Sequence, residues 1–186
     1  MTIDQQDYSM ITSFDTEDKQ AYCREAEIQE RAFVADRLPQ LGLDGIINPE
    51  KKFNIYVPDL IVDGLLSDLK SQFKPFFKVG MLYGIDPQWS VSFNLKDGRR
   101  YADKYPGIVV FFDVHWKTTT MTIRGRDYRV KPIHHTYAGY LSDVMKAIDE
   151  CGNKKHIYQR RINDADGNAL DSWLFDVRKL QRLDKE

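Results

Sequence analysis

The sequence has few cysteines, no long apolar run and no leader-like start, and each absence narrows the class of protein. Its 2 cysteines among 186 residues, Cys23 and Cys151, have neither a metal-binding nor a disulfide spacing. We therefore expect reduced thiols in a cytoplasmic protein. No run of about 18 apolar residues occurs, so we expect no membrane-spanning helix. The first twenty residues are polar and acidic, unlike a signal or transit peptide.

Motifs for nucleotide-driven and acyl-transfer chemistry are also absent. The chain has no glycine-rich phosphate loop, no G-x-S-x-G elbow and no cysteine–histidine pair at a recognisable spacing. Its 4 histidines have no zinc spacing, and the segment 164–168 reads as a turn because it lacks the closing glutamate of an EF-hand. These absences disfavour ATP-driven enzymes, acyl transferases and dedicated zinc or calcium sites.

The composition is that of a folded soluble protein. Hydrophobic residues make up 42% of the chain and charged residues 30%, and the length suits one well-buried core. We expect a flexible acidic segment over residues 1–15 and a single domain over residues 16–186. The net charge is −1, although residues 1–36 hold nine acids and three bases. Charge alone therefore leaves the partner open.

Hydrophobic spacing predicts a mixed α/β domain. We expect a helix over residues 16–38, ended by Pro39 and Gly42. Strands over 53–62 and 65–73 would be joined by a two-residue turn at Asp63-Gly64. The further expected elements are a strand at 89–95, a basic loop at 96–101, a strand at 108–116, a hairpin at 118–130, a helix at 135–150, a basic strand at 154–162 and a closing strand or short helix at 173–183.

The hairpin around Asp63-Gly64 places charged residues together on one face. With a two-residue turn, Asp59 lies directly opposite Asp68 on the next strand, and Lys70 follows on the same face. Facing carboxylates repel each other by a few tenths to about 1 kcal/mol, and Mg²⁺ removes the conflict by binding both. The same pattern also fits a solvated sheet face with a cross-strand ion pair. The opposite face is apolar and suits a core: Leu60, Val62, Leu65 and Leu69.

Pro58-Asp59 and Asp68-Leu69-Lys70 together read PD-x₈-DLK, which resembles the PD-(D/E)XK signature of the restriction endonuclease-like nucleases. The preceding helical segment, EAEIQERAFVADRL, also matches the order of elements in that superfamily. The pattern is closest to the Holliday-junction resolvase and Mrr-type branch, and it covers roughly residues 25–75. The resemblance implies an αβββαβ-type core, with a mixed central β-sheet flanked by helices and with C-terminal additions.

The resemblance also implies a role for each matching residue. Asp59 and Asp68 would be metal ligands, joined by the main-chain carbonyl of Leu69 and by a helical acid. Glu30 is that acid, with Glu27 as the alternative, because the two lie three residues apart on one helix face. Lys70 would orient or activate water, and Gln72, two residues further on the same face, would occupy a polar position of the catalytic set. The second acid is an aspartate where glutamate is commoner in the family, and the spacing between the two acids is short.

Two basic segments are candidates for contact with nucleic acid. Cations with interleaved tyrosine or histidine suit phosphate contacts and base stacking, although each segment also fits a plain solvated surface. The predicted nucleic-acid-binding residues are Arg99, Arg100, Lys154, Lys155, Arg160 and Arg161.

Three functions are consistent with these features. The leading hypothesis is a Mg²⁺-dependent nuclease that hydrolyses DNA through metal-activated water in a bacterial or phage-infected cell, with Mn²⁺ able to substitute and a homodimer possible. The alternative is a catalytically inactive nuclease-fold protein that binds nucleic acid or regulates, of phage or mobile-element type. A third is an interaction protein whose acidic N-terminal segment contacts a basic partner.

Overall fold

The computed structural model describes residues 19–157 and 171–184, with the side chains of residues 19–23 left out. Its first element is a continuous helical segment made of α1 (Lys19–Ala32), the π-helical turn η1 (Phe33–Arg37) and α2 (Leu38–Leu41). Gly42 ends the segment with φ of +74°, and its N–H donates to the carbonyls of α2. The predicted helix is confirmed over its described part. The prediction that Pro39 ends it is wrong, because the wider π-helical turn just before α2 accommodates the proline ring.

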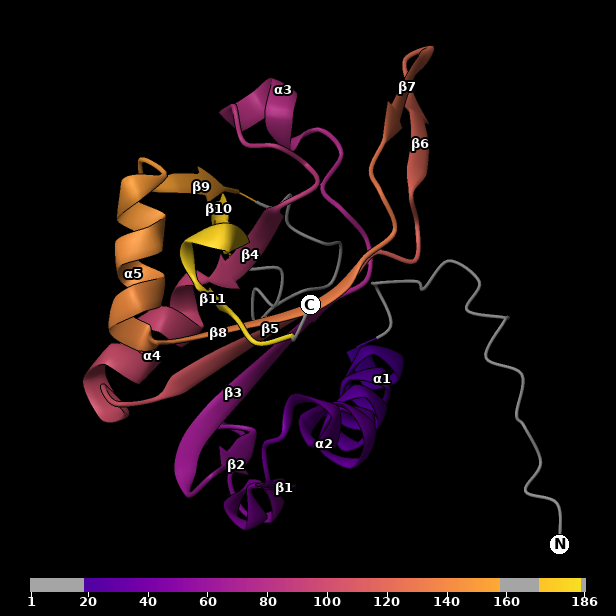
Figure 1. The fold of residues 1–186 in the computed structure, drawn as a ribbon. Helices are drawn as coiled ribbons and strands as arrows, with labels where there is room; N and C mark the ends of the chain where they lie inside the picture. Colours follow the sequence, from indigo (N-terminus) through magenta and orange to yellow (C-terminus); the bar gives the residue numbers. More distant parts are fainter. Residues whose placement is uncertain (1–18, 158–170, 185–186) are drawn as a thin grey trace, which may run out of the picture.

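The central sheet has six strands in the order β1-β2-β3-β5-β8-β11. The pair β3–β5 is parallel, and all other neighbours are antiparallel. The protein is therefore α/β with a mixed central sheet flanked by helices, as the sequence predicts at this level (Figure 1). The strand bounds are β1 Gly45–Ile47, β2 Leu60–Val62, β3 Leu65–Gln72, β5 Val109–His115, β8 His134–Tyr140 and β11 Gln181–Arg182.

Two smaller sheets and several short helices complete the described structure. A three-stranded sheet has the order β4-β10-β9, and β6 pairs only with β7. Their bounds are β4 Ser90–Asn94, β6 Thr120–Ile123, β7 Arg126–Arg129, β9 Lys154–His156 and β10 Ser172–Asp176. The helices are η2 Pro49–Lys52, α3 Val79–Tyr83, α4 Leu95–Lys104, α5 Leu141–Glu150 and η3 Val177–Lys179. In the described part of the chain, no helix is long and apolar enough to cross a membrane.

The central sheet buries both of its faces. Phe33 and Leu38 of the N-terminal helical segment pack with Leu69 and Phe111 on one face. On the other face, a larger core joins β5 to α5 and to the three-stranded sheet: Val110, Phe112, Val114, Val144, Ile148, Phe93, Trp173 and Phe175. Figure 1 shows α1 and α2 on one side of the sheet and α4 and α5 on the other. Burial on both faces explains why β5 is an almost unbroken apolar run.

The predicted loop at 96–101 is wrong, because these residues belong to α4. The side chain of Asn94 caps the helix by accepting a hydrogen bond from the N–H of Lys96. Gly98, which lies within the predicted loop, faces Trp173 so closely that a Cβ atom would lie 2.7 Å from its ring. This glycine permits close packing of helix on sheet.

Three other predicted elements need correction. The strand expected at 53–62 is confined to β2, since residues 53–59 form a loop with turns. The helix expected at 135–150 divides into strand β8 and helix α5, because residues 134–140 form the ladder between β5 and β11. The strand expected at 154–162 ends at His156, and residues 158–162 and the turn at 164–168 lie outside the described residues.

The remaining predictions of elements hold. Strands β4 and β5 lie at 90–94 and 109–115, and the hairpin β6–β7 turns at Arg124-Gly125. The closing segment contains β10, η3 and β11, so it combines two strands with a short helix. Gly152 follows α5 with φ of +79°, a conformation that suits glycine after the end of a helix.

Candidate functional site: an acid–lysine cluster on the β2–β3 hairpin

The β2–β3 hairpin has the register that the sequence predicts. Asp63 and Gly64 both have positive φ, +47° and +78°, as a two-residue type I′ turn requires. Val62 pairs with Leu65 next to the turn, and the ladder ends at the pair Leu60–Ser67. Strand β2 then ends, so Asp59 lies just beyond the ladder rather than in it.

Asp68 is the buried centre of the site, with a side chain that is 1% exposed. Its carboxyl group lies close enough to that of Asp59 for each acid to shift the pKa of the other, so the structure brings the two predicted acids together. The hydroxyl of Tyr101, on α4, donates to Asp68 Oδ1 at 2.6 Å. Lys70 Nζ lies 2.8 Å from Asp68 Oδ2, as expected for residues two apart on one strand face. Asp68 of β3 thus contacts a lysine of its own strand and a tyrosine of α4.

Helix α4 also holds the site lysine in place. Lys70 Nζ donates to Asp97 Oδ2 at 2.8 Å, so the ammonium lies between the carboxylates of Asp68 and Asp97. Arg100, one turn later on α4, binds Asp97 Oδ1 at 2.9 Å and donates to the hydroxyl of Tyr101. These contacts restrict the position of the ammonium group.

A second lysine connects the N-terminal helix to the hairpin. Lys51 Nζ, at the end of η2, lies 2.6 Å from Asp59 Oδ1 and 2.6 Å from Glu30 Oε2. The structure therefore brings Glu30 to the site, while Glu27 is exposed on the same helix. We call the following residues the acid–lysine cluster: Glu30, Lys51, Asp59, Asp68, Lys70, Asp97, Arg100 and Tyr101.

The two facing aspartates have pKa values displaced in opposite directions. Burial, together with the charge of Asp59, raises the pKa of Asp68 to about 7 in spite of the nearby Lys70. Burial also acts to raise the pKa of Asp59, but its interaction with Asp68 and the charges of Lys70 and Lys51 lower it overall. Near neutral pH, Asp68 therefore holds a proton much of the time while Asp59 is ionised.

The remaining charges of the cluster follow from their neighbours. Burial would lower the pKa of Lys70, but the carboxylates around it raise that pKa well above its ordinary value. Burial and the nearby Asp59 raise the pKa of Glu30. When Asp68 is protonated, the other three acids of the cluster balance its three cations. Ionisation of Asp68 leaves one uncompensated negative charge, which favours binding of a further cation.

The donor set suits a hard divalent cation in its chemistry. Carboxylate and carbonyl oxygens are the ligands that Mg²⁺ takes, and Asp59, Asp68 and Glu30 supply carboxylates. Leu69 packs its side chain into the core on the opposite sheet face, so only its main-chain carbonyl is available. Across the described residues, no three histidine, cysteine or acidic side chains converge closely enough to form a ready metal site. Glu30 and Asp59 do not share a metal site in this arrangement, because the ammonium group of Lys51 lies between their carboxylates.

Gln72, predicted as a catalytic residue, bridges two sheets. Its amide Nε2 donates to the carbonyl of Ser92 at 3.1 Å, and its Oε1 accepts from the N–H of Ser92 at 3.4 Å. The side chain thus pairs with the main chain of β4 as a strand residue would. Gln72 also lines a groove of about 390 Å³ together with Lys74 and Lys78.

The predicted nucleic-acid-binding residues fall in separate places. Arg100 belongs to the acid–lysine cluster, whereas Arg99 is exposed on the same helix. Lys154 and Lys155 are exposed on β9. The two others, Arg160 and Arg161, lie outside the described residues.

An exposed apolar loop borders the cluster. Phe53 is 90% exposed, Ile55 77% and Tyr56 55%, although main-chain hydrogen bonds order this loop. The Arg100 guanidinium lies 6.0 Å from the ring centre of Tyr56, which connects the loop to α4. A contiguous exposed apolar group beside a charged cluster is a typical contact surface.

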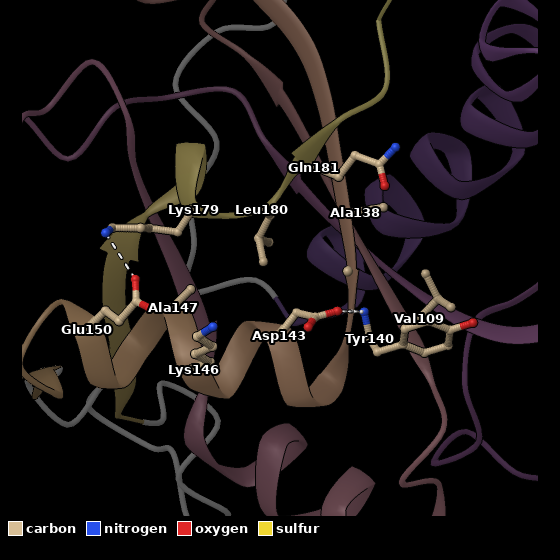
Figure 2. A pocket seen from close by; sticks show the side chains of 11 residues that line it. Val109, Ala138, Tyr140, Asp143, Lys146, Ala147, Glu150, Lys179, Leu180 and Gln181 are labelled. Carbon is tan, nitrogen blue, oxygen red and sulfur yellow. Dashed lines mark hydrogen bonds and ion pairs between the residues drawn. The ribbon is translucent and has the colours of Figure 1, made fainter.

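A groove of about 420 Å³ lies elsewhere, between β8, α5 and η3 (Figure 2). Its rim holds an ion pair of 3.0 Å between Lys179 and Glu150. Asp143 accepts a hydrogen bond from the N–H of Tyr140 and caps α5 there. The groove shares no residue with the acid–lysine cluster.

Comparison of the chain with known protein families, curated proteins and solved structures finds no match in any of the three.

Proposed function

We propose that the protein is a Mg²⁺-dependent nuclease that hydrolyses DNA phosphodiester bonds, built on a restriction endonuclease-like core. The observation that carries the proposal is the buried Asp68, which lies 2.8 Å from Lys70 and close enough to Asp59 for the two acids to shift each other's pKa, on a hairpin of the predicted turn register. The element order supports it: a helix, three antiparallel strands, then α4 and a strand parallel to the third. The sheet of β4, β9 and β10 would be the addition to that core.

A divalent cation held by Asp59, Asp68, Glu30 and the Leu69 carbonyl would supply a water of lowered pKa and charge stabilisation at the phosphoryl group. Lys70 keeps its proton because of its raised pKa, so it donates hydrogen bonds rather than accepting a proton. Its role is to stabilise negative charge that develops on a phosphoryl oxygen.

Helix α4 contributes positioning residues to the proposed site. Tyr101 holds one oxygen of Asp68, and Asp97 holds both Lys70 and Arg100. A site lysine fixed by two carboxylates needs little reorganisation when charge develops, which is the condition for effective electrostatic catalysis. The exposed loop with Phe53 and Tyr56 would contact the substrate next to the cleavage point.

The experiment is cleavage of DNA by the wild type and by Lys70→Ala in Mg²⁺ or Mn²⁺. We expect Lys70→Ala to lower the cleavage rate by about a hundredfold or more. Lys179→Ala removes an exposed lysine paired with Glu150 and is the matched control, with an expected rate equal to that of the wild type. Equal rates for wild type and Lys70→Ala would refute the role of Lys70.

One observation favours a second candidate, a nuclease-fold protein that binds nucleic acid without cleaving it. Lys51 already supplies a cation between Glu30 and Asp59, where a metal ligand set would otherwise form. Calorimetric titration with Mn²⁺ separates the two functions. If the protein is a nuclease, the wild type should have a Mn²⁺ site that is lost in Asp59→Ala and strengthened in Lys51→Met. If it only binds nucleic acid, the wild type and both variants should show no Mn²⁺ site.

A further inference from the structure

The β6–β7 hairpin stands apart from the rest of the fold. Its two strands form a sheet of their own, and Figure 1 shows them projecting away from the central sheet. A two-stranded ribbon is marginally stable by itself, so its root must be held by the body of the protein.

The root is held by Gln88 and Trp116. The Gln88 amide donates to the carbonyl of Lys131 at 3.2 Å, and its oxygen accepts from the N–H of Lys131 at 2.6 Å. Trp116, a buried core residue, donates its indole N–H to the carbonyl of Gln88 at 2.9 Å. The hairpin is therefore a protrusion with a fixed base.

The hairpin is strongly basic. Residues 117–131 hold five cations and one acid, Asp127, which accepts a hydrogen bond from Thr122 at 2.6 Å. Arg124, Arg126 and Arg129 are exposed. Within residues 19–157 and 171–184, no acid lies in ion-pair contact with these three arginines. Their charges are therefore available to an external anion.

The two faces of the hairpin differ. Thr120 pairs with Arg129 and Thr122 with Asp127, so one face is polar and exposed. The other face pairs Met121 with Tyr128, and both are half-buried. None of the large apolar side chains exposed in the described structure belongs to the hairpin. A molecule that contacts this hairpin would therefore meet charged and polar groups rather than a large apolar surface.

We propose that the β6–β7 hairpin is a DNA-binding arm that enters the major groove of a duplex. The major groove, about 12 Å wide, admits a two-stranded β-ribbon. Arginines at the tip and on the polar face would bind phosphates and base edges, and the threonines would add hydrogen bonds. The identity of the polyanion as DNA rests on the proposed function, whereas the arm itself needs no catalytic residue.

The test is binding of a fluorescent duplex of about 20 base pairs, measured by anisotropy in EDTA so that no cleavage occurs. The variant replaces the arginines together: Arg124→Gln, Arg126→Gln and Arg129→Gln. We expect Kd to rise at least about tenfold near 0.1 M salt, and the slope of log K against log salt to fall by about 2 to 3. A matched triple variant on α5 and η3 should bind like the wild type: Lys146→Gln, Arg178→Gln and Lys179→Gln.

Three outcomes would refute the proposal that the β6–β7 hairpin is a DNA-binding arm. One is unchanged affinity and salt dependence in the arginine variant. Another is equal loss in the matched control, and the third is equal binding of duplex and a polyglutamate chain by the wild type. A triple Arg→Lys variant, which keeps the charge, should retain most of the salt slope and thereby exclude misfolding as the cause.

Failure of the arm and failure of the nuclease are distinguishable. If the hairpin binds duplex but the wild type never cleaves, only the proposed nuclease fails. If the arginine variant binds and cleaves like the wild type, only the arm fails.

Discussion

Asp68 shows how a single carboxyl group depends on its surroundings. It is buried beside one acid, one ammonium group and one hydroxyl. Its raised pKa means that the folded protein holds a proton there that the unfolded chain releases in mild acid. A group with this behaviour at the centre of a charged cluster is typical of functional sites, although ion-pair networks also produce it.

The pKa of Asp68 leads to a stability prediction. Because the folded-state pKa, about 7, lies above the ordinary value of 3.8, the protonated carboxyl group of Asp68 stabilises the metal-free protein at low pH. This contribution is lost as pH rises from the lower value to the higher. Asp68→Asn removes this titration while keeping the shape of the side chain. We therefore expect the stability of Asp68→Asn relative to wild type to increase by about 2 kcal/mol between about pH 5 and about pH 8.

Urea denaturation of both proteins in EDTA, at several pH values, measures this difference. A relative stability that does not change with pH would contradict the raised pKa of Asp68. Asp103→Asn, an exposed acid on α4, provides the control and should follow the wild type.

At the scale of elements, α4 connects fold and site. One turn of this helix supplies Asp97, Arg100 and Tyr101 to the acid–lysine cluster. The packing of α4 against the three-stranded sheet depends on Gly98, which faces Trp173 and Phe93. The position of α4 therefore depends on a glycine, because any side chain at residue 98 would keep the helix further from the sheet.

The substitution Gly98→Ala tests whether this close packing of α4 on the sheet requires glycine. Alanine is a better helix former than glycine by about 1 kcal/mol, but its Cβ would lie 2.7 Å from the Trp173 ring. We expect the clash to prevail and the substitution to destabilise the protein by about 1–3 kcal/mol. Chemical denaturation measures the change, with the exposed Lys96→Ala on the same helix as a near-neutral control. A Gly98→Ala protein as stable as the wild type would show that the sheet yields at this point.

At the scale of the whole molecule, a polar network connects the C-terminal strand to the N-terminal helix. Asp184 forms an ion pair with Arg37, and its other oxygen accepts from the N–H of Thr136 at 2.8 Å. Arg37 also donates to the hydroxyl of Thr136, which in turn donates to the buried Asp113. Segments distant in sequence are thus joined across one edge of β8.

Asp184→Ala should destabilise the protein, because it leaves Arg37 partly buried with one fewer partner. The expected loss is about 2–4 kcal/mol, measured by thermal or chemical unfolding. Asp171→Ala, a half-buried acid at the start of the same C-terminal segment, is the comparison, and its loss should be smaller. A loss below that of Asp171→Ala would mean that the network adds little to stability.

Local pattern alone determined the strands around Asp63-Gly64, the central strand β5 and the shared face of Asp68 and Lys70. Those features depend on turn chemistry and on a period of two, which neighbouring residues specify. The partners of these residues were beyond such reasoning. Lys51 and Asp97 come from helices whose positions depend on packing, and lone charged residues carry no signal of what they will meet.

Tertiary structure also decided the elements that the sequence interpretation misjudged. From sequence alone, Gly98 is typical of a turn, but in the structure it lies in a helix packed against Trp173. The spacing of residues 135–150 is typical of a helix, but pairing with β5 and β11 makes its first part a strand. The sequence by itself predicted which two acids come together. Only the assembled fold determined that Asp68 is buried and that its pKa is raised, because burial and the field of neighbouring charges belong to the packed molecule.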